Sequence, residues 1–207
     1  MRITILGSGS PLPDPNRAGP STLVQAGGAS LLVDCGRGAL MRLAAAGGSV
    51  QNLTAVLITH LHSDHITDLN DVITSRWALS LAPNPLRVVG PEGTGRVVER
   101  TLTMLEDDIG YRLEHHDDLT EPPQVEVTEV NDGPVDLGVA GIVVTAAPER
   151  IPDPLLEQLA VGAHMVIPVG DFYQELMVIT RTESGFEERS VIPVRFVPMT
   201  GEIERQD

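Results

Sequence analysis

The sequence predicts a layered α/β fold, and the order of its apolar segments is the reason. Short apolar stretches at residues 2–6 and 53–59 have the length and composition of strands. Between them, residues 39–46 form a helical segment that Gly47 and Gly48 end. Strands that alternate with helices are expected to form a sheet whose faces the helices cover.

The remaining elements follow the same alternation. Apolar residues recur at helical spacing from Ile66 to Trp77, where Asp64 or Asp68 is expected to cap the first turn or to interact with its dipole. A further helix is expected from Pro91 to Ile109. The other strands are expected at residues 21–25, 30–33, 86–89, 124–130 and 141–146, followed by a short helix at 154–159 and strands at 164–169, 175–181 and 187–196.

Composition places the chain among globular proteins. Its 207 residues suffice for one full core or for two small units that share one. No apolar run reaches the roughly 18 to 20 residues of a membrane span, and the N-terminus begins directly as a strand, so we expect no membrane association and a cytoplasmic location. The single cysteine, Cys35, excludes an internal disulfide and agrees with that compartment.

The charge of the chain bears on its substrate. The formal net charge is −15, and every one of the 14 basic residues is arginine. A strongly acidic surface repels phosphate backbones and gains nothing from counterion release. We therefore expect a small-molecule ester as substrate and regard nucleic acid as unlikely.

A dense group of metal-binding residue types follows the strand at 53–59. His60 and His62 are two residues apart in extended backbone, so their side chains share a face. A turn at Ser63 would bring Asp64 and His65 to a second position close by. Two divalent ions about 3.5 to 4 Å apart need such an arrangement, with hydroxide as the nucleophile. The alternative is an ordinary loop without a ligand.

Three stretches of the first 147 residues resemble one family. They are ILGSGSPLPDPNRAGPSTLV, LLVDCGRGALMRL and LITHLHSDHITDL. Together they are similar to metallo-β-lactamase-fold hydrolases, particularly the branch of ribonuclease Z and the arylsulfatase-like enzymes. The resemblance implies a mixed sheet with flanking helices, a zinc cofactor and a possible homodimer.

The same resemblance implies roles for individual residues. His60 and His62 would bind one zinc ion, and Asp64 and His65 the second. Asp64 would also assist proton transfer. Asp34 would be a buried group that supports the ligands, or alternatively a helix cap after its strand.

The family site also requires ligands from a second half of the protein: a histidine for the first metal, an aspartate that bridges both, and a histidine for the second. Only His115, His116 and His164 remain in the chain. His115 and His116 are expected in a charged loop, either solvated or in contact with metal or substrate. His164 begins a strand and is expected to be structural.

The end of the chain resembles a different family. The stretches IVVTAAPERIPDPLLEQLAVGAHMVIPVG and QELMVITRTESGFEERSVIPVRFVPMTGE are similar to the C-terminal third of protein-L-isoaspartate O-methyltransferase. The Gly-rich loop that would hold S-adenosylmethionine in that family is missing upstream. We therefore expect two parts, residues 1–147 and 148–207, each derived from a different enzyme.

Three functions follow from this organisation. The first is a zinc hydrolase of a phosphoester, sulfate ester or similar small ester, in which the missing ligands impair the site. The second is a methyltransferase related to protein-L-isoaspartate O-methyltransferase. The third is a catalytically inactive chimeric fold.

Overall fold

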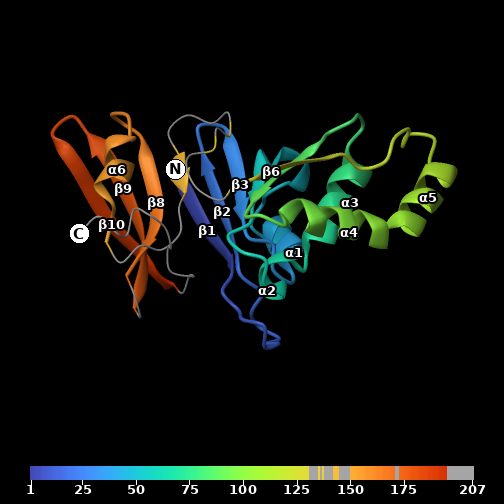
Figure 1. Ribbon diagram of the computed structural model, residues 1–207, viewed down its shortest axis with the longest axis horizontal. Coiled ribbons are helices and arrows are strands. Elements are labelled where there is room, and N and C mark those ends of the chain that lie inside the picture. Colours follow the sequence, from blue (N-terminus) through green and yellow to red (C-terminus); the bar gives the residue numbers. More distant parts are fainter. Residues whose placement is uncertain (131–134, 136, 138–141, 145–149, 171–172, 195–207) are drawn as a thin grey trace. The chain divides into compact units, whose positions relative to one another are not determined.

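The computed structural model describes residues 1–130, 135, 137, 142–144, 150–170 and 173–194 (Figure 1). The chain forms two compact units, one of Arg2–Leu137 and one of Gly138–Asp207 together with Met1. The boundary expected between residues 147 and 148 lies outside the described residues and stays a prediction.

One mixed sheet organises the first unit. Within its described residues, six strands follow one another in sequence order across the sheet. They are β1 (Arg2–Gly7), β2 (Ser21–Ala26), β3 (Ala29–Val33), β4 (Ala55–Leu57), β5 (Leu86–Gly90) and β6 (Val125–Glu129). The pairs β1–β2 and β2–β3 are antiparallel, whereas β3, β4, β5 and β6 pair in parallel. The carboxyl ends of these four strands therefore meet at one edge of the sheet.

A row of apolar side chains crosses this sheet. Leu23 pairs with Leu32, Leu32 with Val56, Val56 with Val88, and Val88 with Val127, one step from each strand to the next. Residues in register on neighbouring strands point to the same face. All five belong to, or pack against, one hydrophobic core.

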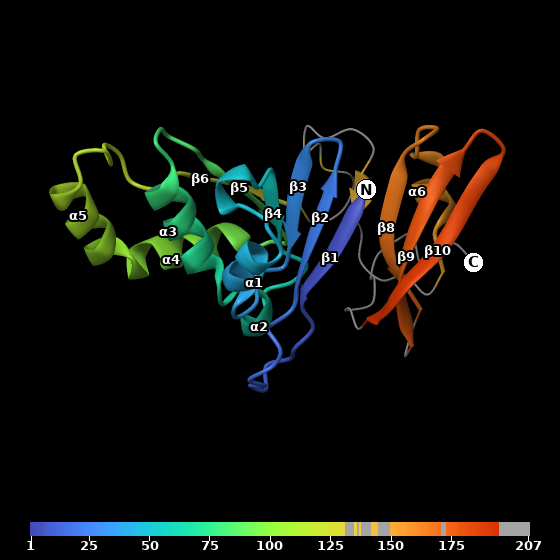
Figure 2. The same ribbon diagram turned by 180° about the vertical axis from the view of Figure 1, so that it is seen from behind.

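Helices cover that face. They are α1 (Ala39–Ala45), α2 (Ser63–Ile66), α3 (Leu69–Leu79), α4 (Thr94–Met104) and α5 (Glu106–His115), with a 3₁₀ turn at Val50–Asn52. Leu43 of α1, Val72 of α3 and Val98 of α4 are buried in the same core as the row of strand residues. In contrast, α5 contains no buried residue and lies at the end of the unit opposite β1 (Figures 1 and 2).

The second unit has a smaller sheet. Its described strands are β7 (Ile142–Val144), β8 (His164–Val169), β9 (Gln174–Thr182) and β10 (Gly185–Val194), in the order β10-β9-β8-β7. The pair β7–β8 is parallel, and the pairs β8–β9 and β9–β10 are antiparallel. Leu155 and Leu156 of α6 (Asp153–Glu157) pack against a core that includes Met165, Ile167 and Ile179.

The α/β class and its mixed sheet are confirmed, and one expected helix differs. The single helix expected up to Ile109 is two helices, because the backbone leaves the helical conformation at Leu105. Glu106, Asp107 and Asp108 then open α5, where acidic side chains suit the positive end of a helix dipole. Among the described residues, no helix is both long and apolar enough to cross a membrane.

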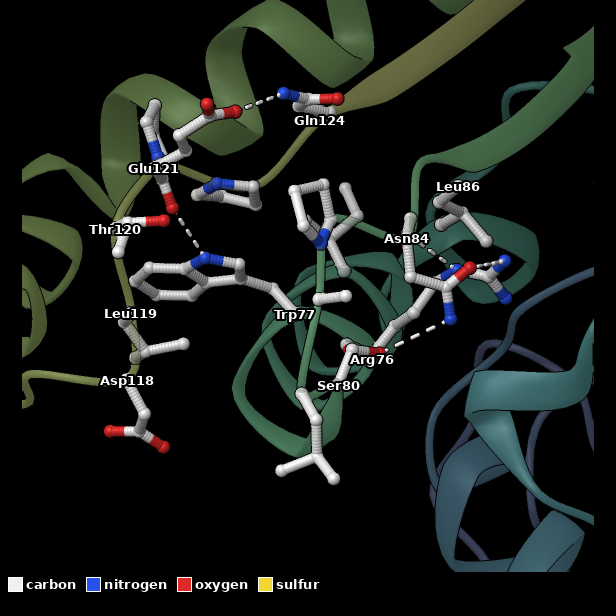
Figure 3. Close-up of a pocket in the computed structure, with 16 residues that line it drawn as sticks. Arg76, Trp77, Ser80, Asn84, Leu86, Asp118, Leu119, Thr120, Glu121 and Gln124 are labelled. Atoms are coloured by element: carbon white, nitrogen blue, oxygen red, sulfur yellow. Dashed lines mark hydrogen bonds between the residues drawn. The ribbon is translucent and has the colours of Figure 1, made fainter.

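A cavity of about 160 Å³ lies at the amino-terminal edge of the parallel strands (Figure 3). Its lining includes Trp77, whose indole Nε1 donates a hydrogen bond of 2.7 Å to the carbonyl oxygen of Glu121. Arg76 lies beside it and is only 6% exposed. The cavity is at the opposite end of the strands from the histidines that follow β4, so it does not belong to the same site.

Arg76 donates hydrogen bonds to the backbone carbonyl oxygens of four residues, which lie in two segments, 50–53 and 84–85. Its Nη1 donates to the carbonyl oxygens of Val50 and Leu53, both at 2.9 Å. Its Nε donates to the carbonyl oxygen of Asn84, and its Nη2 to the Asn84 side chain and to the Pro85 carbonyl. The planar guanidinium fork supplies all of these bonds at once, which an ammonium group cannot do.

Arg76→Lys is therefore expected to lower the free energy of unfolding by about 2 to 3 kcal/mol, because buried carbonyl groups lose their donors. Urea unfolding measures the change. Arg42→Lys, at an exposed position of α1, is the matched control and should stay within about 0.5 kcal/mol of the parent. A loss at Arg76 no larger than at Arg42 would contradict this account.

Candidate metal centre

The histidines lie in the connection that leaves β4 at the carboxyl edge of the sheet. Ile58 still donates a backbone hydrogen bond of 2.7 Å to Val89, so the strand partner guides the chain up to this point. His62 has extended backbone and precedes α2, which contains Asp64 and His65. The turn expected at Ser63 is thus a single helical turn that begins at Ser63.

His60 and His62 form the first pair of candidate ligands. The Nε2 atom of His60 and the Nδ1 atom of His62 are 3.1 Å apart. Two nitrogens that bind one tetrahedral zinc ion at 2.0 to 2.1 Å are separated by about 3.3 to 3.4 Å. This contact is a hydrogen bond between the two rings, and its length is close to the separation that two ligands of a single ion would have.

Asp64 and His65 form the second pair. Asp64 is 8% exposed, and its Oδ2 atom is 3.7 Å from Nε2 of His65. The rings of His65 and His60 have centroids 3.9 Å apart, so the two pairs are neighbours. The structure thus brings together all four of the residues predicted as metal ligands.

One buried carboxylate organises both pairs. Asp34 is 3% exposed, directly follows β3 and has a φ of 59°, a left-handed conformation that aspartate adopts more readily than most residues. Its Oδ1 atom accepts the backbone N–H of Thr59 at 2.8 Å, and both its oxygens lie 2.9 Å from the Thr59 hydroxyl. Its Oδ2 atom is 2.7 Å from Nδ1 of His65.

This network assigns a tautomer to each histidine it reaches. Because His65 Nδ1 faces a carboxylate, that nitrogen carries the proton and Nε2 keeps its lone pair. Because the Thr59 hydroxyl donates to Asp34, it accepts at 3.0 Å from His60 Nδ1, which leaves His60 Nε2 with its lone pair. Metal-binding histidines are commonly oriented in this way by a partner at the other ring nitrogen.

Local electrostatics favour the metal-binding form of His60. Burial lowers the pKa of the His60 imidazole, and the neighbouring His65 and His62 lower it further, whereas Asp34 and Asp64 oppose the shift. A lowered pKa keeps the ring neutral near pH 7. A neutral imidazole is the form that binds a divalent ion.

The sequence allowed Asp64 or Asp68 to act as a helix cap or as a partner of the helix dipole. The cap roles are wrong, whereas Asp64 does lie in the first turn of α2, where an acidic side chain suits the helix dipole. Neither α2 nor α3 has a side-chain hydrogen bond at its cap, so Asp64 and Asp68 do not cap the helices beside them. Nor does Asp34 cap α1, because its carboxylate is occupied by Thr59 and His65. Asp68 instead accepts two backbone N–H groups at the start of α1.

The four candidate ligands do not amount to a complete site. Among the residues that the structure describes, no group of three or more His, Cys, Asp or Glu side chains is placed to hold one ion. The four donors come together as two pairs, whereas catalytic zinc usually has three protein ligands.

The other histidines lie elsewhere. His115 ends α5 rather than lying in a loop, and its Nδ1 is 2.7 Å from the carbonyl oxygen of Tyr111. The helix α5, which His115 ends, lies apart from α2, which contains Asp64 and His65 (Figures 1 and 2). His164 begins β8 and contacts the Thr180 hydroxyl at 2.9 Å, as a structural residue would.

Asp34→Asn should reverse the tautomer of His65. The amide would present N–H to Nδ1, so the proton would move to Nε2 and remove the lone pair that a metal needs. Long-range ¹H–¹⁵N NMR spectra of the imidazoles report the change. Asp71→Asn, an exposed carboxylate of α3, is the control; an unchanged His65 tautomer in Asp34→Asn would contradict the network.

Comparison of the sequence with known proteins identifies its relatives. A ribonuclease Z of Mycolicibacterium gilvum is 58% identical over 137 residues, which cover 65% of this chain and 48% of the relative. A ribonuclease Z of Mycobacterium bovis (strain BCG / Pasteur 1173P2) is 47% identical over 193 residues, covering 81% of this chain and 69% of the relative. The chain spans about half the length of the M. gilvum relative and of two further curated relatives.

Solved structures and family models add to this result. The crystal structure of the short form of human tRNase Z aligns with a TM-score of 0.50 at 21% identity, over 91% of this chain and 64% of that chain, which shows a shared fold. Residues 1–89 match the family model of the anti-Pycsar protein Apyc1. Residues 89–204, more than half of the chain, match the model of protein-L-isoaspartate(D-aspartate) O-methyltransferase. The chain therefore belongs to the ribonuclease Z family of metallo-β-lactamase-fold proteins through its N-terminal part, and to the protein-L-isoaspartate(D-aspartate) O-methyltransferase family through residues 89–204.

Proposed function

We propose that this protein is a metal-dependent phosphodiester hydrolase whose reaction centre is the His60 to His65 segment. The observation that carries the proposal is the hydrogen-bond network of Asp34. It places the proton on Nδ1 of His60 and of His65, so that each Nε2 keeps its lone pair. These Nε2 atoms lie 3.1 Å from His62 Nδ1 and 3.7 Å from Asp64 Oδ2, respectively. A loop without a ligand has no need of such an arrangement.

Each pair would hold one divalent ion, for which we propose zinc: His60 with His62, and Asp64 with His65. When bound, such ions polarise the substrate oxygen and lower the pKa of water. The protein's own residues hold the geometry, since the Asp34 carboxylate keeps a proton at His65 Nδ1. Asp64, a carboxylate beside the reaction centre, is the residue to which we assign transfer of the proton from the attacking water.

For the substrate, we propose a phosphodiester of RNA. The relatives are named as ribonucleases, which supports RNA as the substrate despite the net charge of −15. The acidic surface favours the alternative, a small phosphoester or sulfate ester that does not follow a polyanionic backbone. A homodimer, expected from the sequence, belongs to the same proposal.

His60→Ala and His62→Ala should each reduce bound zinc, measured by atomic emission after dialysis. Each should also reduce hydrolysis of bis(p-nitrophenyl) phosphate to the buffer rate, because a single remaining ligand of the first pair holds zinc too weakly. His115→Ala, at an exposed position of α5, is the control and should match the parent protein. If the parent protein binds less than one metal ion per chain and shows no turnover, the hydrolase proposal is rejected. The catalytically inactive chimeric fold would then be the remaining hypothesis.

A short RNA and the small phosphodiester, assayed side by side, distinguish the two substrate classes. Faster turnover of RNA, weakened by added salt, supports the ribonuclease proposal. Turnover of the small ester alone supports the alternative.

The match of residues 89–204 favours a second candidate, methyl transfer from S-adenosylmethionine to a protein carboxylate. The sequence argues against it, because no Gly-rich loop of the kind that holds this cofactor was found upstream. Calorimetric titration with S-adenosylmethionine tests it directly, and absence of binding heat removes it.

A further inference from the structure

Asp68 lies three residues after His65 and joins two segments that are far apart in the sequence. Its Oδ1 atom accepts the backbone N–H of Gly38 at 3.0 Å, and its Oδ2 atom accepts that of Leu40 at 2.8 Å. Both N–H groups belong to the amino-terminal end of α1, where the helix dipole attracts a carboxylate. The first turn of α1 has no acidic residue, and its own cap residue, Gly38, has no side chain.

Backbone hydrogen bonds continue this connection. The N–H of Cys35 donates to the carbonyl oxygen of His65 at 2.7 Å, and the N–H of Asp68 donates to the carbonyl oxygen of Cys35 at 2.9 Å. A Cβ atom on Gly36 would be only 2.3 Å from the carbonyl oxygen of Asp64. The segment that contains Asp64 and His65 therefore packs closely against residues 34–40. Only glycine at position 36 lets the Asp64 carbonyl oxygen come this near to the backbone.

The two ligand pairs differ in what holds them. His60 follows β4 within three residues, and Thr59 is bonded to Asp34 through both its backbone and its hydroxyl. Asp64 and His65 lie in a helix of only four residues, which cannot keep its place by its own hydrogen bonds. The contacts of this short helix with residues 34–40, together with the two hydrogen bonds of Asp68, hold it in place.

We propose that Asp68 is a positioning residue that fixes Asp64 and His65 against Asp34, so that it governs the second ligand pair and not the first. The metal readout of this inference rests on the proposed function, and the thiol readout described below is independent of any metal. No contact between Asp68 and substrate is involved.

Cys35 is the reporter for the first experiment. It is the only cysteine of the chain, is fully buried, and lies between His65 and Asp68 in the backbone contact. We compare its rate of reaction with dithionitrobenzoate in the metal-free parent, Asp68→Ala, Asp68→Asn and Asp71→Asn. Loss of two charge-assisted hydrogen bonds should expose the thiol about tenfold more often or more in Asp68→Ala.

The control variants sharpen this measurement. Asp68→Asn keeps a carbonyl oxygen for one of the two N–H groups and should react at an intermediate rate, and it also serves if Asp68→Ala fails to fold. Asp71→Asn removes a charge from an exposed position of α3. Because Asp71 also raises the pKa of the Cys35 thiol, though less than Asp68 does, this variant controls for the effect of charge alone and should react only slightly faster than the parent. Equal rates for the Asp68 and Asp71 variants would overturn the proposal.

The second experiment titrates Co²⁺ into the same proteins and follows its visible absorption. Outer partners of metal ligands typically contribute a factor of about 10 to 100 in affinity. We expect this loss in Asp68→Ala for the second equivalent of Co²⁺ alone, with partial rescue in Asp68→Asn. Equal weakening of both equivalents would indicate a general effect on folding and would overturn the selective role.

The two experiments separate the two proposals. If the parent binds no Co²⁺, the proposed hydrolase fails, and the thiol rates alone decide the role of Asp68. If the parent binds Co²⁺ and the Asp68 variants bind both equivalents as the parent does, the hydrolase survives and the positioning role is rejected.

Discussion

The rest of the site depends on the hydrogen bonds that the buried Asp34 carboxylate forms with Thr59 and His65. A buried carboxylate is costly unless it is hydrogen-bonded, and Asp34 meets this demand with the N–H and hydroxyl of Thr59 and with the ring of His65. Its need for donors sets the direction of the Thr59 hydroxyl, which in turn sets the tautomer of His60. One side chain thus prepares a histidine in each of the two ligand pairs.

Parallel strand pairing explains why these groups meet. Val33 pairs with Leu57, so Asp34 and Thr59 leave neighbouring strands at the same edge of the sheet. The apolar row on the strands, packed under α1, α3 and α4, holds that register. A slip of one residue would turn the row away from the helices and would separate Asp34 from Thr59. The same strand register is therefore required both for packing of the core and for the contact between Asp34 and Thr59.

The chain belongs to two enzyme families, and the ranges that match them overlap along the sequence. Its N-terminal part contains the two proposed metal-ligand pairs. Residues 89–204 match a methyltransferase family, and the ribonuclease Z relatives, which match over 65% and 81% of the chain, extend into the same residues. With two ligands for each proposed ion rather than three, affinity depends more heavily on how well each pair is preorganised. The Asp34 network and the Asp68 contacts are the means of preorganisation that the structure displays.

Sequence alone determined the α/β class, most strand positions and the four ligand candidates, because apolar periodicity and the His-x-His-x-Asp-His spacing are local properties of the chain. It did not reveal the helix break at Leu105, the bridging role of Thr59 or the attachment of Asp68 to α1. Asp34 and Thr59 are 25 residues apart, and Gly38 and Asp68 are 30 apart. Partners so far apart in the sequence meet only when the sheet has formed. Asp68 directly precedes α3 and could cap it, but tertiary packing brings its carboxylate to the amino-terminal end of α1 instead.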